Sequence, residues 1–134
     1  MTTTKLTVSL LAIFTLLIPI ECLAQATQHP VAVWCGGDDG LTSRLRDATE
    51  RAFNATSDLP LGTKERPAVY KVLIPTNVDW KQVGTRTKVI YSIKLLKMDD
   101  REVGTFKGDC WEPRINSCGI QIVDRTRGLL NESK

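Results

Sequence analysis

Cysteines give the strongest chemical signal in the chain, and two of its four lie in the segment Gly108–Gly119, GDCWEPRINSCG. Zinc sites need three or four ligands and usually bring cysteines two to four residues apart, whereas Cys110 and Cys118 are eight apart. A thioredoxin-like redox pair needs only two intervening residues. The spacing therefore favours a structural disulfide, and we expect neither a metal site nor a cofactor.

The pairing of this disulfide depends on Cys35, a third cysteine that is distant in the sequence. In the chain-entropy model, closing the loop from Cys110 to Cys118 contributes about 2.5 kcal/mol, and closing Cys35 to Cys110 about 4.5 kcal/mol. Geometry decides between them, because the two Cα atoms must come within about 7 Å. We favour Cys110–Cys118, because a strand, turn and helix would bring the chain back on itself there. The alternative pairs Cys35 with Cys110; otherwise Cys35 stays free.

Catalytic side chains are sparse. His29 is the only histidine, so a Ser-His or Cys-His unit would need the first residues of the folded part. Two carboxylate pairs, Asp38-Asp39 and Asp99-Asp100, lie at predicted turns, where aspartate is common. Asp38 and Asp39 belong to GGDDG, which lacks the spacing of a phosphate-binding loop and instead resembles an acidic helix start. We therefore assign no catalytic residue and expect a protein that is not an enzyme.

The amino terminus has the three parts of a secretory signal. Lys5 precedes an uncharged apolar run from Leu6 to Ile20, and small residues follow at Ala24 and Ala26. The run of 15 residues is shorter than the roughly 20 that a membrane-spanning helix requires. We predict a signal peptide over residues 1–26, cleaved after Ala26, and one small domain over residues 27–134, a length of 134 − 26 = 108 residues.

Export sets the expected surroundings of this domain. We predict a periplasmic or secreted protein with no membrane span. Lipidation at Cys22 is disfavoured, because Glu21 stands where a small residue is usual. The net charge of +3 is too small to indicate nucleic-acid binding, which requires a clustered basic face.

Apolar periodicity predicts the secondary structure. Leu45, Ala48 and Ala52 recur at helical spacing, and the same helix would place Arg46 and Glu50 together at i,i+4. The expected elements are a strand at 31–35, a helix at 40–55, strands at 68–75, 85–97 and 103–109, and a helix at 113–129. This order, β-α-β-β-β-α, predicts an α+β fold in two layers, with an antiparallel sheet of three to five strands and two helices on one face.

Function should then lie on the surface. Trp80, in a polar link at 75–88, is a candidate anchor for a protein partner, and Lys88 and Lys94 are candidates on a neighbouring sheet face. We predict an exported, non-enzymatic binding or accessory domain that acts through a protein partner. One alternative is an inhibitor or immunity-type protein that blocks an exported hydrolase through the Cys110–Cys118 loop, using Trp111 and Arg114. A second alternative, a small hydrolase, requires carboxylates that converge in a pocket.

Overall fold

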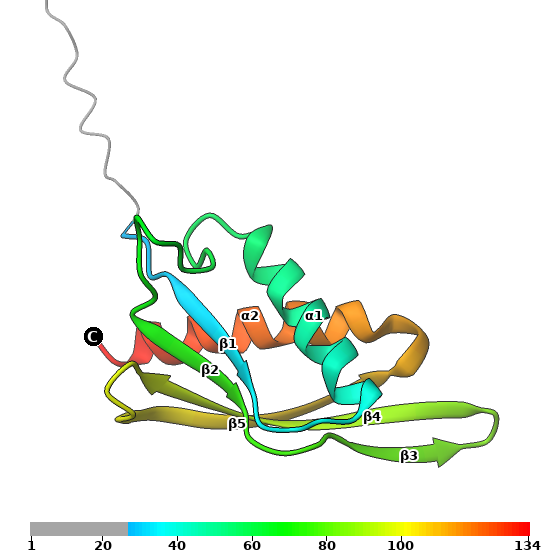
Figure 1. Ribbon diagram of the computed structural model, residues 1–134. Coiled ribbons are helices and arrows are strands. Elements are labelled where there is room, and N and C mark those ends of the chain that lie inside the picture. The colour runs from blue at the N-terminus through cyan, green and yellow to red at the C-terminus, as the bar shows by residue number, and fades with distance from the viewer. Residues whose placement is uncertain (1–26) are drawn as a thin grey trace, which may run out of the picture.

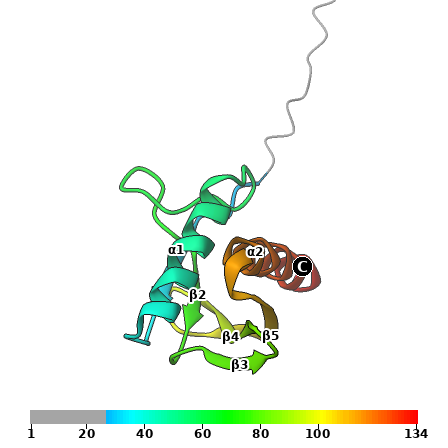
Figure 2. The same cartoon turned by 90° about the vertical axis from the view of Figure 1, so that its right-hand side faces the viewer.

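The computed structural model describes residues 27–134, so the predicted signal peptide and Cys22 lie outside the described residues. Two helices cross one face of a sheet, as Figures 1 and 2 show. The elements in chain order are β1 (Val31–Cys35), α1 (Gly40–Asn54), β2 (Tyr70–Ile74), β3 (Asp79–Val83), β4 (Arg86–Lys97), β5 (Glu102–Trp111), the 3-10 helix η1 (Glu112–Arg114) and α2 (Ile115–Glu132). Neither α1 nor α2 is long and apolar enough to cross a membrane.

The long strand β4 organises the sheet. It pairs with β2 and β3 along one edge and with β5 along the other, and all three pairings are antiparallel. β1 pairs with β2 in parallel, because α1 carries the chain back before β2 begins. The predicted two-layer α+β fold is confirmed. Its five-stranded sheet is mixed, whereas antiparallel pairing was expected throughout.

The predicted polar link at 75–88 contains a strand, β3, that the sequence reading missed. β2 pairs with only one end of β4, from Lys94 to Lys97, and leaves the other end of that edge open. β3 pairs with this open end, from Arg86 to Ile90. The reading failed because all five β3 residues are exposed, so no alternation of apolar and polar residues marks the strand.

The core lies between the helices and the sheet face toward which Val89, Tyr91, Ile93 and Leu95 point. Within it, α1 and α2 come very close at Gly119. A Cβ atom on Gly119 would lie 2.5 Å from the carbonyl oxygen of Ala48 in α1. A glycine at this position therefore allows the backbones of α1 and α2 to pack closely.

The disulfide links Cys110, near the end of β5, to Cys118 in α2, with the Cα atoms 5.6 Å apart. This confirms the favoured pairing and rules out the Cys35–Cys110 alternative. Cys35 is free and half-buried, and its thiol donates a hydrogen bond to the carbonyl oxygen of Gly37 at 3.3 Å. The bridge therefore holds the amino-terminal end of α2 against the sheet.

Candidate functional site: a groove beside the projecting arm

An arm made of β3 and the paired end of β4 extends past the helices (Figure 1). Its two strands meet at a tight turn after Val83, before Arg86 resumes the pairing. Gly84 in this turn has a φ of +62°, a conformation that glycine adopts without steric cost. The arm therefore follows from local turn chemistry together with the open edge of β4.

Trp80 is the most exposed large apolar side chain of the arm. It lies opposite Val89 in the ladder, so both side chains point to the helix side of the sheet. Val89 is fully buried, whereas Trp80 lies on the edge strand β3 and remains 64% exposed. The structure thus places the predicted anchor on the surface rather than folded back over the core.

A groove of about 500 Å³ separates the arm from the start of α1. Its lining combines the indole of Trp80 and the half-buried Leu41 with polar side chains on both sides. The lining residues are Asp39, Gly40, Leu41, Arg44, Trp80, Thr87 and Glu112.

One ion pair joins two walls of the groove. Arg44 of α1 donates a hydrogen bond from a guanidinium nitrogen to the Glu112 carboxylate of η1, at 2.8 Å. Both side chains are at least one-third exposed, so the pair contributes little to folding stability. It can, however, exchange partners with a polar group that enters the groove.

Asp39 fixes the helix end of the groove. Its carboxylate accepts a hydrogen bond from the Thr42 backbone N–H at 2.7 Å and caps α1, as the acidic helix start predicted. Hydrogen bonds from the Thr42 side chain and then from its N–H hold the pKa of Asp39 below its ordinary value. Thr42 is fully buried, and its hydroxyl accepts the N–H of Val78 at 2.9 Å. The entry to β3 is therefore tied to the start of α1.

The groove lining has a restricted set of functional groups. It contains no histidine, cysteine or lysine that could act as nucleophile or base beside its two carboxylates. No group of three or more His, Cys, Asp or Glu side chains within residues 27–134 is placed to hold a metal ion. What the groove offers is an aromatic anchor, an apolar neighbour and a rim of hydrogen-bonding groups.

The other sequence candidates are not brought together with Trp80. Lys88 and Lys94 alternate with buried residues of β4 and lie on the opposite face of the sheet. Trp111 pairs with Lys88 on that face, with its ring 3.9 Å from the Arg86 guanidinium and 5.4 Å from the Lys88 ammonium. These contacts hold the half-buried indole against the sheet.

Arg114 is exposed at the end of η1, on the segment between the two bridged cysteines. That segment is a helical turn leading into α2 rather than a projecting loop. The inhibitor hypothesis needs both Trp111 and Arg114 to project outward, and only Arg114 does so.

Sequence reasoning missed most of the groove. Leu41, Arg44, Thr87 and Glu112 were not singled out, and Arg44 and Glu112 are 68 residues apart in the chain. No local pattern connects these positions. An apolar residue in the first turn of α1, Leu41, was the one available signal.

No protein-family model matches this sequence, and no curated protein matches it. Several solved structures align with this chain, including the following two. Protein XCC0632 from Xanthomonas campestris, described with the family model DUF330, aligns with a TM-score of 0.55 and 13% identity over 78% of this chain and 87% of its own. A PelC dodecamer from Paraburkholderia phytofirmans aligns at 0.46 and 13% identity, over 78% and 89%. The first alignment shows a shared fold, whereas the TM-score of the second is too low to support any argument.

Proposed function

We propose that this protein is an exported, non-enzymatic binding domain that docks a protein partner in the groove beside Trp80. The observation that carries the proposal is that the Trp80 side chain is 64% exposed and lines a groove of about 500 Å³. Tryptophan is enriched among the few interface residues that supply most of the binding free energy. An aromatic side chain held open to solvent on a projecting arm is suited to such a role.

Export is supported by two features. The first 26 residues have the composition of a secretory signal. The folded part carries the Cys110–Cys118 disulfide, and such bonds persist mainly in oxidising compartments. The proposed location is therefore the periplasm or the exterior of the cell.

The docking proposal is tested by photo-crosslinking in the native host. A photoreactive benzoylphenylalanine at position 80 should give a discrete adduct with one partner protein, which mass spectrometry then identifies. The matched control is the same residue at position 120, because Ile120 is also exposed, at 57%, but lies in α2 and does not line the groove. Adducts that are equal at both positions, or none at position 80, would contradict the proposal.

Once the partner is identified, its affinity provides the quantitative test. Trp80→Ala should weaken binding at least about 30-fold, as expected for an interface hot spot worth about 2 kcal/mol. Ile120→Ala, a change at an exposed residue of α2, should leave the dissociation constant unchanged. An unchanged constant for Trp80→Ala would show that the groove is not the docking site.

Export is tested separately by the intact mass of protein recovered from the host. The expected chain starts at Thr27 and has 134 − 26 = 108 residues with one disulfide. A mass that retains residues 1–26 would exclude cleavage after Ala26. A chain starting at a lipidated Cys22 would instead place the protein on a membrane.

A further inference from the structure

β1 lies at the edge of the sheet and has a free side. Its residues alternate, with Ala32 and Trp34 directing their backbone groups toward β2. Val31 directs its backbone to the other side, where its N–H donates to the Pro60 carbonyl and its C=O accepts from the Gly62 N–H, both at 2.9 Å. A short loop segment thus already pairs with this edge, as a parallel bridge.

Val33 and Cys35 continue the same side of the strand. By the same alternation, their N–H and C=O groups point away from β2, and the loop leaves the edge after Gly62. No residue of the described chain pairs with these groups. The edge therefore presents backbone donors and acceptors at the spacing that another strand requires.

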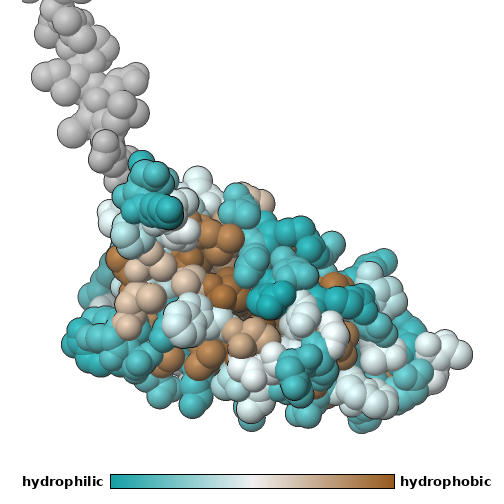
Figure 3. Space-filling view, viewed as in Figure 1, coloured by the Kyte–Doolittle hydropathy of each residue, from teal (hydrophilic) through white to brown (hydrophobic). Residues whose placement is uncertain are grey.

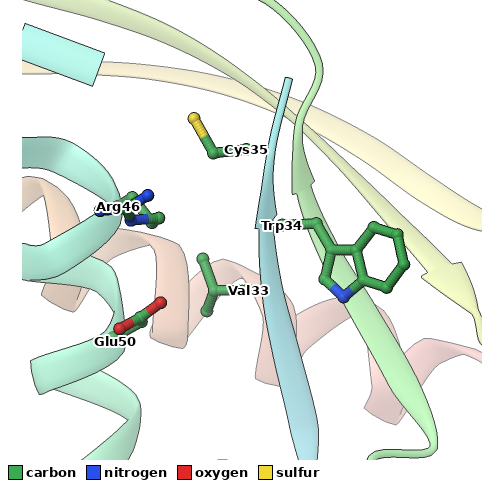
Figure 4. Close-up of a pocket in the computed structure, with 5 residues that line it drawn as sticks. All are labelled: Val33, Trp34, Cys35, Arg46 and Glu50. Atoms are coloured by element: carbon green, nitrogen blue, oxygen red, sulfur yellow. The ribbon is translucent and has the colours of Figure 1, made fainter. Parts of the chain in front are cut away.

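A groove runs along this free edge, with α1 as its second wall. Two hollows of about 480 and 360 Å³ share Val33 and Glu50 as lining residues. Figure 4 shows the side chains of Val33 and Cys35 directed toward Arg46 and Glu50 of α1, with Trp34 on the opposite side of β1. Figure 3 shows apolar surface gathered over β1 and β2. An extended chain placed here would have a strand edge on one side and a helix on the other.

The charge of the groove indicates what its occupant carries. Arg46 donates hydrogen bonds to the Asp47 carboxylate at 3.1 and 3.3 Å, instead of to Glu50 as the i,i+4 spacing predicted. Glu50 makes no hydrogen bond or ion pair with any residue of the described part. Arg46 is near enough for its charge to interact with that of Glu50, but both carboxylate oxygens of Glu50 stay free to accept hydrogen bonds at the position that both hollows share.

We propose that the groove between β1 and α1 binds an extended segment of another polypeptide as an added strand. The main chain of the segment pairs with the N–H and C=O groups of Val33 and Cys35. A lysine or arginine of the segment reaches Glu50. Strand addition draws affinity from main-chain hydrogen bonds and specificity from alternate side chains, and this groove supplies both kinds of contact. The site is separate from the Trp80 groove and does not depend on it.

The probe is a phage-displayed library of random linear peptides, selected against the disulfide-intact protein. Selected peptides should share one lysine or arginine at a fixed position. In a two-dimensional NMR titration with one such peptide, the amide signals of Val33 and Cys35 should shift downfield and gain protection from hydrogen exchange. Peptides that perturb other amides, or a selection that enriches no sequence, would overturn the proposal.

The contribution of the Glu50 charge is tested by a substitution that removes the charge and keeps the shape of the side chain. Glu50→Gln should weaken peptide binding about fivefold at low salt, the size expected of a partly exposed ion pair. Glu132→Gln, the same change at the exposed end of α2, is the control and should have no effect. Equal affinity for Glu50→Gln and Glu132→Gln would refute the assigned role of Glu50.

Val33→Pro tests the edge directly. Proline lacks the N–H that faces the free side, and edge strands tolerate it there, so the β1–β2 pairing should survive. Peptide binding should be lost while the rest of the spectrum stays native. Native binding by this variant would overturn the strand-addition model. If Val33→Pro does not fold, the protection of the Val33 and Cys35 amides in the wild-type protein and the effect of Glu50→Gln on peptide affinity still test the proposal. Self-association through the same edge, seen by sedimentation without peptide, would show instead that the occupant is a second copy.

Discussion

Gly119 is the residue of α2 that lies against the backbone of α1, and Gly119→Ala should destabilise the protein. The added Cβ atom would lie 2.5 Å from the carbonyl oxygen of Ala48, 2.8 Å from its carbonyl carbon and 3.1 Å from the nitrogen of Thr49. All three are backbone atoms inside α1, so no flexible side chain can move aside. Relief requires α1 and α2 to separate by about 0.9 Å, the difference between 2.5 Å and an ordinary contact of 3.4 Å.

Two opposing effects set the magnitude. Alanine inside a helix is favoured over glycine by about 1 kcal/mol. Overpacking of a well-filled core costs typically about 1–3 kcal/mol and occasionally more. Because this overlap is with the backbone and lies close to the Cys118 bridge, we expect the larger cost to apply. The net loss in the free energy of unfolding should then be about 2 kcal/mol.

Gly128 is a matched control in the same helix, because a Cβ atom there would meet nothing within 4 Å. Gly128→Ala should stabilise the protein by about 0.5–1 kcal/mol through helix propensity alone. Urea unfolding of both variants with the disulfide intact measures the difference, and equal slopes would show that the compactness of the two states is unchanged. If Gly119→Ala proves as stable as Gly128→Ala, the close approach of the helices is not as described.

Three further outcomes are expected. Replacing both Cys110 and Cys118 with serine should lower the free energy of unfolding by about 2.5 kcal/mol, measured by urea titration, and no loss would contradict the chain-entropy account of the bridge. Trp80→Ala should change thermal stability by less than about 0.5 kcal/mol, because the side chain is 64% exposed; a larger loss would indicate a structural role. Hydrogen bonding to Arg127 lowers the pKa of Asp58 in the folded protein. The Asp58–Arg127 pair therefore contributes its full stabilisation to the folded protein at pH values above the pKa of Asp58 in the unfolded chain, about 3.9. This contribution is lost as the pH falls through the lower pKa of Asp58 in the folded protein. Asp58→Asn should accordingly lower the free energy of unfolding by less than about 1 kcal/mol at neutral pH and should have no effect in strong acid. Urea titrations at both pH values measure this, and a difference from wild type that persists in acid would disprove the linkage.

The sequence by itself determined the helices and strands that have one buried face and one exposed face. The helix at α1 and the strand at β4 were predicted because one side of each is buried, and burial imposes a period of 3.6 or 2 residues on the apolar positions. The Cys110–Cys118 bridge was also within reach, because strand, turn and helix follow each other directly and bring the two Cα atoms to 5.6 Å.

Tertiary structure alone decided where residues distant in the chain meet. β3 leaves no apolar pattern because both of its faces are exposed, and it forms because β4 is longer than β2. The groove joins Arg44 to Glu112 across 68 positions, and β1 keeps a free edge because it lies at the end of the strand order with β2 on one side only. Local sequence carries propensity and periodicity, whereas these contacts depend on which strand edges remain open once the sheet has assembled.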